Sequence, residues 1–145
     1  MLMTIALASD HAGYAYKERI KVLLDARGLP WKDYGTFSDE RADYPDFAHA
    51  AARGILAGEC SRGIFVCGSG LGIGMAANRH RGIRAAMCQT VEAARLSRLH
   101  NDANVLAIGE RLADWETATA MIDTWLTTPF EGGRHCARIE KIDAV

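Results

Sequence analysis

The stretch from Ile64 to Asn78 constrains the fold more than any other part of the chain, because its amino-acid composition changes twice along its length. It opens as an apolar run typical of a buried strand, passes through alternating glycines, and resumes as small residues that favour a helix. A strand that leads through glycines into a helix presents bare backbone N–H groups at the positive end of the helix dipole. The sequence therefore predicts an anion-binding loop, and Cys67 and Ser69 lie inside it.

The rest of the chain alternates between strand-like and helix-like segments. Strands are predicted over 4–9, 30–34, 63–66, 82–87 and 105–108, and helices over 16–26, 44–56, from the glycine loop to about 78, from the cap Thr90 to about 99, from 114, and within 132–145. Such alternation predicts an α/β fold, a Rossmann-like three-layer α/β/α domain spanning 1–145 around a five-stranded parallel sheet. We expect the strand order 2-1-3-4-5.

That order places two polar clusters together. The winding of the sheet reverses between the first and third strands, and such sheets bind ligands at the carboxyl ends of the strands that flank the reversal. Asp10 and His11 follow the first strand, while Cys67 and Ser69 follow the third. We therefore expect these four side chains to converge.

Composition excludes several broad classes. A chain of 145 residues with net charge −1 has no overall basic field for nucleic acid or an anionic membrane. No apolar run approaches the length of a spanning helix, and the N-terminus does not resemble a signal peptide. The cysteines form no CxxC pair, which favours a reducing, cytoplasmic location over a disulfide framework or a zinc knuckle; they are Cys60, Cys67, Cys88 and Cys136.

The glycine loop must be distinguished from similar motifs. No Lys-Ser/Thr pair ends it, so it is not a P-loop. Its glycines fall at 68, 70, 72 and 74, which does not fit the dinucleotide pattern GxGxxG. A cysteine phosphatase would need an arginine where Ile73 stands. What remains is a loop that holds a small anion or an oxyanion beside a thiol.

Each candidate residue also has a structural interpretation. Cys67 could be a packed thiol at a strand end, although a helix N-terminus would lower the pKa of such a thiol. Ser69 and Asp10 could be helix caps, and lone histidines are more often structural than catalytic. Arg134 and Arg138 could form a solvated face, but their i,i+4 spacing points both guanidiniums the same way, as phosphate binding requires.

Several motifs together resemble one family. They are Ser9–Gly13, Arg41–Pro45, Cys67–Ile73, Ala76–Asn78, Leu99–Leu106 and Gly132–His135. In this order and spacing they resemble the B type of ribose-5-phosphate isomerase, a family that includes the subunits of galactose-6-phosphate isomerase. The resemblance covers essentially the whole chain.

The resemblance implies an aldose–ketose isomerase that needs neither metal nor cofactor and interconverts ribose 5-phosphate and ribulose 5-phosphate through a cis-enediolate. It implies that Cys67 is the base and that His100 opens the sugar ring. The expected catalytic group is Cys67, His100, Ser69 and Asp10. The expected substrate-binding group is Asp10, His11, Tyr44, Gly68, Ser69, Gly70, Leu71, Gly72, Asn101, Arg111, Arg134 and Arg138, of which His11 and the arginines would hold the phosphate.

Two positions bear on the branch of the family. Some members carry a catalytic carboxylate at the position of Gly74, where this chain has no side chain. Galactose-6-phosphate subunits typically lose the histidine at the position of His100, so its retention favours ribose. Allose, galactose or tetrose phosphates remain alternative substrates. The alternative to an enzyme is a non-catalytic subunit that binds a sugar phosphate. The family also implies a homodimer or tetramer with shared sites, in which the tail 129–145 packs on the partner.

Overall fold

The computed structural model describes residues 3–145 and contains a five-stranded parallel sheet. The strands are β1 (Ile5–Ser9), β2 (Trp31–Asp33), β3 (Arg62–Cys67), β4 (Ala85–Met87) and β5 (Val105–Gly109). The helices are α1 (Tyr14–Ala26), α2 (Tyr44–Leu56), α3 (Leu71–Asn78), α4 (Val91–Leu99), α5 (Trp115–Thr127) and α6 (His135–Asp143), with a short 3-10 helix, η1 (His11–Gly13), before α1. The predicted α/β class is confirmed.

The order of the strands is β2-β1-β3-β5-β4, so the last two strands stand in the opposite order from the one we expected. Burial explains the difference. All five residues of β5 are buried, as an interior strand of a parallel sheet requires. The three residues of β4 pass from buried to exposed, which suits an edge strand.

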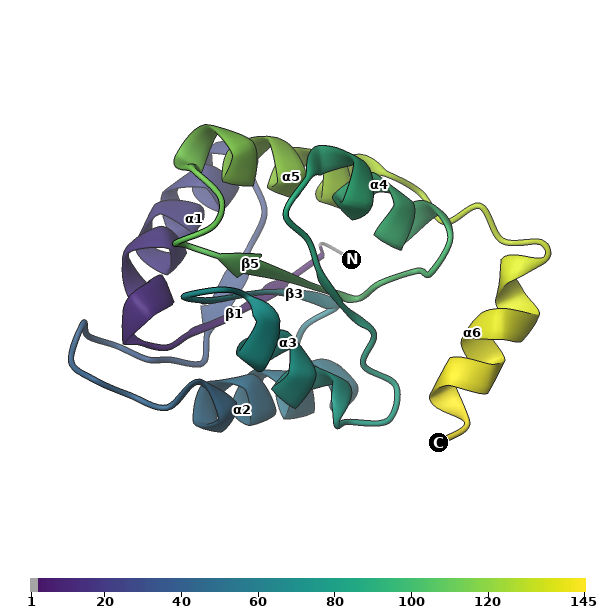
Figure 1. The fold of residues 1–145 in the computed structure, drawn as a ribbon, viewed down its shortest axis with the longest axis horizontal. Helices are drawn as coiled ribbons and strands as arrows, with labels where there is room; N and C mark the ends of the chain where they lie inside the picture. The colour runs from purple at the N-terminus through teal and green to yellow at the C-terminus, as the bar shows by residue number, and fades with distance from the viewer. Residues whose placement is uncertain (1–2) are drawn as a thin grey trace.

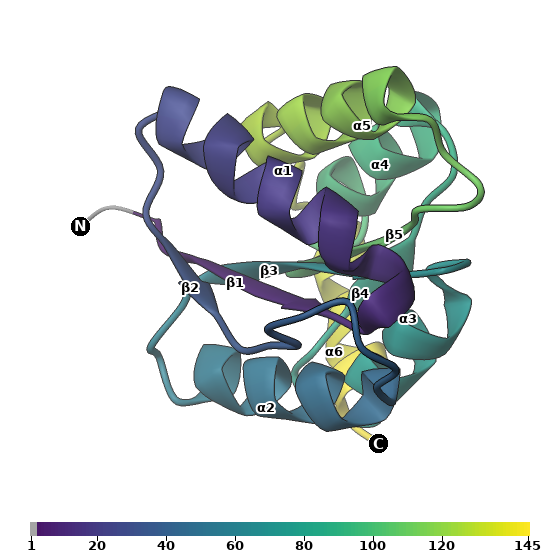
Figure 2. The same ribbon diagram turned by 90° about the vertical axis from the view of Figure 1, so that its left-hand side faces the viewer.

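The helices cover both faces of the sheet (Figures 1 and 2): α1, α4 and α5 lie on one face, and α2 and α3 on the other. Right-handed crossovers dictate this division. The connections β1 to β2 and β4 to β5 step along the sheet in one direction, so α1 and α4 share a face. The connections β2 to β3 and β3 to β4 step the other way, which places α2 and α3 together.

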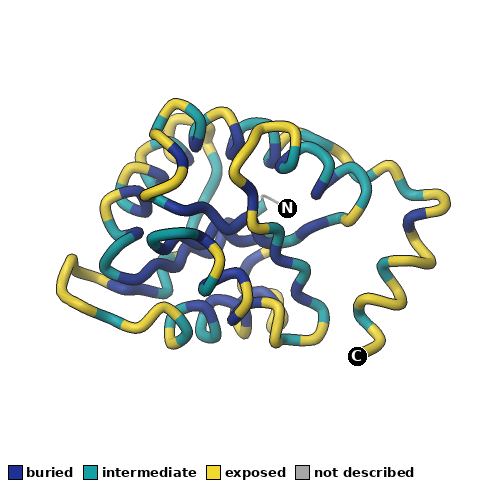
Figure 3. Tube along the Cα trace, viewed as in Figure 1, coloured by how far each residue is buried: buried dark blue, intermediate teal, exposed yellow. Residues whose placement is uncertain are grey.

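Alternation along each strand divides the core into two layers, one on each face of the sheet. Figure 3 shows the central strands in dark blue, as buried residues. On β1, Ile5 and Leu7 face the layer shared with α1 and α5, where Trp125 is fully buried. Ala6 and Ala8 face α2, which contributes alanines of its own. These small side chains let α2 pack closely on the sheet.

Two asparagines shape the edge of the sheet. The Asn78 amide donates to the carbonyl of Ala85 at 3.0 Å and accepts from its N–H at 2.8 Å. Asn104 accepts from the N–H of Arg84 at 2.7 Å and donates to the carbonyl of Gly82 at 2.8 Å. The Asn104 side chain thus bonds the backbone just before β4, within the predicted strand over 82–87, and the observed strand covers only Ala85–Met87.

The predicted terminal helix is present as α6, and it stands apart from both layers (Figure 1). Of its residues only His135 is buried. Two arginines attach its far end to the body, where Arg81 donates to the carbonyls of Asp143 and Ala144 and Arg84 pairs with the Asp143 carboxylate at 2.7 Å. No helix among residues 3–145 is long and apolar enough to cross a membrane.

Candidate active site

The predicted glycine loop lies at the carboxyl edge of the sheet, between the end of β3 at Cys67 and the start of α3 at Leu71. Gly70 is the N-cap of α3 with φ of +76°, a left-handed conformation that glycine adopts without strain. A Cβ at Gly70 would lie 2.8 Å from the carbonyl carbon of Ile108, and one at Gly109 would lie 2.5 Å from the carbonyl of Ser69. The end of β5 therefore packs directly on the loop and fixes its path.

Cys67 and Ser69 both engage the start of α3. The Cys67 thiol is buried, and its Sγ accepts a hydrogen bond from the N–H of Gly70 at 3.2 Å. The Ser69 hydroxyl accepts from the N–H of Leu71, also at 3.2 Å. The other N–H groups of the first helical turn have no acceptor within the helix, so the loop can offer these donors to a negatively charged oxygen.

The turn after β1 lies beside this loop, as the sequence predicted. Ser9 pairs with Val66, so Asp10 and Cys67 leave the sheet side by side. The Asp10 carboxylate is buried and accepts from the N–H of Gly13 at 3.1 Å. A Cβ at Gly13 would lie 2.4 Å from the carbonyl oxygen of Val66, so the turn is packed tightly on the end of β3.

Three more predicted residues border the same edge. The Tyr44 ring, at the start of α2, lies where a Cβ on Gly72 would approach it to 2.5 Å. The Arg111 guanidinium, two residues beyond β5, would be 3.0 Å from a Cβ on Gly68. His11 Nδ1 lies 3.1 Å from both the backbone N and O of Ala42, which ties the turn after β1 to the loop before Tyr44.

His100 lies at the opposite edge of the sheet. It caps the C-terminal end of α4 and precedes Val105, the residue of β5 that pairs with Gly63 at the start of β3. Cys67 pairs with Gly109 at the other end of the same ladder. The intervening strand spans roughly 13 Å at about 3.3 Å per residue, and Figure 1 shows the ends of α4 and β3 on opposite sides. One chain therefore does not bring His100 to Cys67.

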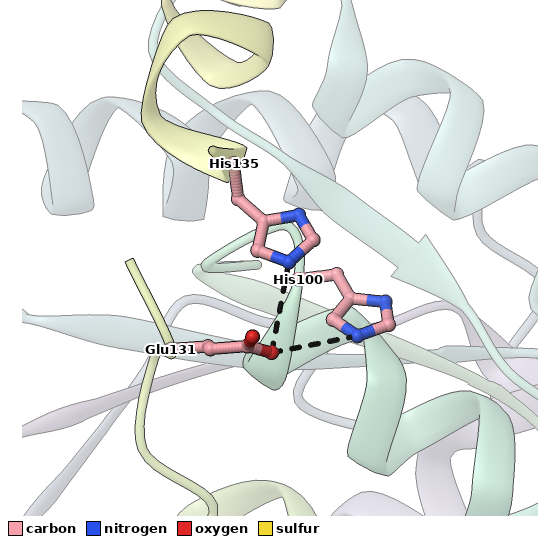
Figure 4. Close-up of side chains that lie close together, drawn as sticks. All are labelled: His100, Glu131 and His135. Carbon is pink, nitrogen blue, oxygen red and sulfur yellow. Dashed lines mark ion pairs between the residues drawn. The ribbon is translucent and has the colours of Figure 1, made fainter. Parts of the chain in front are cut away.

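A second polar cluster forms around His100 (Figure 4). The His100 and His135 rings stack with their centroids 4.5 Å apart and 15° between their planes. Glu131 Oε2 lies 3.7 Å from His100 Nε2 and 3.6 Å from His135 Nε2, while Arg134 approaches Oε1 of the same carboxylate to 3.5 Å. Burial, followed by the positive charge of Arg134, lowers the pKa of the His135 imidazole.

The sequence-predicted residues thus divide between two edges. The carboxyl edge gathers Asp10, His11, Tyr44, Cys67, Gly68, Ser69, Gly70, Leu71, Gly72 and Arg111, and the other holds His100, Asn101 and Arg134, with Arg138 farther along α6. Sequence reasoning missed Glu131 and His135. The signal in the sequence is their i,i+4 spacing on either side of Gly132 and Gly133, next to Arg134, the one residue of this motif with a predicted role.

A doubly wound parallel sheet with a thiol, a hydroxyl and a carboxylate around a glycine loop defines an α/β protein with a site for a small anionic ligand. A sequence model described as Ribose/Galactose Isomerase matches residues 5–142. The chain belongs to this ribose/galactose isomerase family.

Named relatives match along nearly the full chain. Ribose-5-phosphate isomerase B of Escherichia coli is 46% identical over 141 residues, which cover 97% of this chain and 95% of that protein. The structure of Clostridium thermocellum ribose-5-phosphate isomerase B superposes with a TM-score of 0.96 at 49% identity, covering 98% of this chain and 96% of that one. The Thermotoga maritima enzyme gives a TM-score of 0.96 at 50% identity, with 99% of each chain covered.

Proposed function

We propose that this protein is an aldose–ketose isomerase that interconverts D-ribose 5-phosphate and D-ribulose 5-phosphate through a cis-enediolate. The observation that carries the proposal is the buried Cys67 thiol at the end of β3, inside a loop of amide donors. Membership of the ribose/galactose isomerase family and the names of the similar enzymes support it.

In the proposed reaction the Cys67 thiolate removes the proton from C2 of the open-chain aldose. The C–H electron pair becomes the C1–C2 double bond, and the carbonyl pair moves onto O1. Ser69 and the amides of the loop stabilise this oxygen, as pre-arranged donors do for other oxyanions. The thiol then returns the proton to C1 while the hydroxyl proton on O2 moves to O1, which leaves the ketone at C2.

His100 is proposed to open the sugar ring by donating a proton to the ring oxygen as its bond to C1 breaks, while the hydroxyl on C1 loses its proton to water and becomes the aldehyde carbonyl. Asp10, Tyr44 and Asn101 are proposed to bind sugar hydroxyls, and His11, Arg111, Arg134 and Arg138 to bind the phosphate. Phosphate binding supplies energy remote from the reacting carbons, and that energy can orient them over the base.

This assignment requires two chains, because His100 and Cys67 lie at opposite edges of one sheet. We propose a homodimer in which each site combines the glycine loop of one chain with His100 and the tail 129–145 of the other. Exposed apolar side chains suit such an interface. Leu71, Met75, Met87 and Val91 on α3, β4 and α4 are all more than a third exposed.

All four cysteines are free, which fits the reducing conditions of the cytoplasm, and we place the enzyme there.

A coupled assay on ribose 5-phosphate tests the proposed function. We expect Cys67→Ala to lower kcat by about 10²- to 10⁴-fold, the usual contribution of a general base, with unchanged circular dichroism. Cys136→Ser, at an exposed cysteine, is the matched control and should retain activity. Normal turnover by Cys67→Ala would exclude this residue as the base.

A substrate panel that includes allose, galactose and tetrose phosphates tests the sugar preference. Exchange of solvent deuterium at C2 of the bound sugar separates an isomerase from a binding subunit, which would show none.

A further inference from the structure

The cluster of His100, Glu131 and His135 has the donor atoms of a metal site. Two imidazole nitrogens and one carboxylate oxygen all lie within 4.8 Å of one another. In Figure 4 dashed lines join Nε2 of each ring to the same carboxylate oxygen. The two contacts to Oε2, at 3.7 and 3.6 Å, are close to the roughly 3.3 Å that separates ligands around a tetrahedral zinc ion with bonds of about 2.0–2.1 Å.

His135 supplies an independent observation. Its side chain is only 6% exposed, and its Nε2 is a buried atom that makes no hydrogen bond with any residue of the described range 3–145. A buried polar atom without a partner is costly in a folded protein. This atom is directed at Glu131, so a ligand held between the two side chains would satisfy it.

The backbone fixes the three residues relative to one another. The N–H of Glu131 donates to the carbonyl of Leu99 at 2.9 Å, which holds Glu131 beside the end of α4 and therefore beside His100. Arg134 approaches Oε1, so Oε2 is left for a cation. The Glu131 side chain is 43% exposed and that of His100 is 36% exposed, so both can move to bring their donor atoms onto one ion, which the stacked imidazole rings require.

We propose that His100, Glu131 and His135 bind a divalent transition metal of the zinc class, and that the bound metal inhibits the enzyme. Two imidazoles and a carboxylate favour zinc and its neighbours over magnesium or calcium, which prefer sites made of oxygen ligands. Three protein ligands leave a fourth position open to water. The inhibition rests on the proposed function, because the metal would occupy the Nε2 of the histidine assigned to ring opening.

Zinc binding is measured by competition with a chromophoric chelator and by metal analysis of dialysed protein. His49 and His80 form another close imidazole pair, so the titrations use His80→Ala as the background. We expect one zinc per chain, at least about tenfold weaker binding in Glu131→Gln and in His135→Ala, and no binding of magnesium. Cys136→Ser is the matched control, because Cys136 follows His135 and its thiol could also bind zinc. This variant should leave the zinc affinity unchanged.

The proposal is overturned if the background protein binds no zinc, or if Glu131→Gln and His135→Ala both retain full affinity. His135→Gln, which keeps a polar side chain of similar size, replaces His135→Ala if the latter loses its circular dichroism signal. The metal should inhibit turnover of ribose 5-phosphate reversibly, with recovery on adding EDTA. Binding without inhibition refutes the inhibitory role, whereas a protein that binds zinc but turns over no sugar phosphate refutes only the proposed function.

Discussion

At the scale of single residues, the glycines of the loop are explained by what packs against them. Gly72 faces the Tyr44 ring, Gly68 faces Arg111, and a Cβ at Gly74 would lie 2.3 Å from Cγ of Met87. A side chain at Gly68 or Gly72 would therefore displace a proposed substrate-binding residue. The absence of side chains at these glycines lets Tyr44, Arg111 and Met87 pack directly against the loop and the start of α3.

The contact between Gly72 and Tyr44 gives a first prediction. Gly72→Ala places a methyl group within 2.5 Å of the Tyr44 ring, so the ring must move. We expect a several-fold rise in KM for ribose 5-phosphate and an unfolding free energy lowered by about 1–3 kcal/mol, as for other overpacked sites. Steady-state kinetics and urea unfolding measure the two effects.

A double-mutant cycle is the control for this prediction. Tyr44→Ala removes the ring, so adding Gly72→Ala to it should cost much less stability than in the wild type. Tyr44→Phe keeps the ring and should leave the full penalty. Equal penalties in all three backgrounds would contradict the steric explanation.

The His49–His80 pair gives a second prediction, on pH. Nδ1 of His49 lies 2.6 Å from Nε2 of His80, and burial, followed by the charges of His49 and Arg53, lowers the pKa of His80. The unfolded chain therefore binds more protons than the folded one below about pH 6.5, so stability falls as the pH drops through that value. We expect the melting temperature to fall between pH 7.5 and 5.5, and to fall less in His80→Gln. An unchanged slope in that variant would contradict the prediction.

At the scale of the elements, a side chain completes the hydrogen bonding of the edge strand β4. Asn78 alone satisfies both the N–H and the carbonyl of Ala85, a buried residue. We expect Asn78→Ala to lower the free energy of unfolding by about 1–3 kcal/mol, because two buried backbone groups lose their partner. Urea unfolding with an unchanged m-value is the measurement.

Asn78→Asp is the matched variant, because it keeps the acceptor for the Ala85 N–H but sets a carboxylate oxygen against the Ala85 carbonyl. Its loss of stability should lessen at low pH, where the carboxyl group carries a proton to donate, whereas that of Asn78→Ala should not. A substitution to alanine without cost would show that the edge of the sheet does not depend on this side chain.

Prediction from sequence worked well at this scale, because helix ends are determined locally. Tyr44–Leu56 was predicted with its observed bounds, since Pro45 suits a first turn and Gly58 follows the end. Thr90 and Asp114 both cap helices as expected, accepting from Ala93 at 3.1 Å and Thr117 at 2.7 Å. The first long helix begins at Tyr14 rather than 16, after a 3-10 turn whose N-cap is Asp10.

At the scale of the whole molecule, the separation of His100 from Cys67 gives a prediction by complementation. Inactive Cys67→Ala and His100→Asn proteins are mixed, unfolded and refolded together. In a mixed dimer one site would contain both altered residues and the other neither. Random pairing makes half of the dimers mixed, so about a quarter of the wild-type activity should return.

The control mixes Cys67→Ala with Ser69→Ala, whose altered residues share one loop. Each site of that mixed dimer would keep one defect, so no comparable recovery is expected. Absence of recovery in the first mixture, with mixed dimers verified by native mass spectrometry, would contradict the two-chain site.

The sequence by itself determined the features that depend on neighbouring residues: the loop from Cys67 to Gly72, the caps and the alternation of strands and helices. It also predicted that Asp10 would lie beside Cys67, because the strands that carry them are central in any doubly wound order. The tertiary structure decided which strand lies at the edge, because that depends on how much of β4 and β5 is buried on both faces. It also decided that His100 faces away from Cys67 and meets Glu131 and His135. Local patterns cannot show this, because such contacts follow from the direction of α4 across the sheet and the path of the chain after α5.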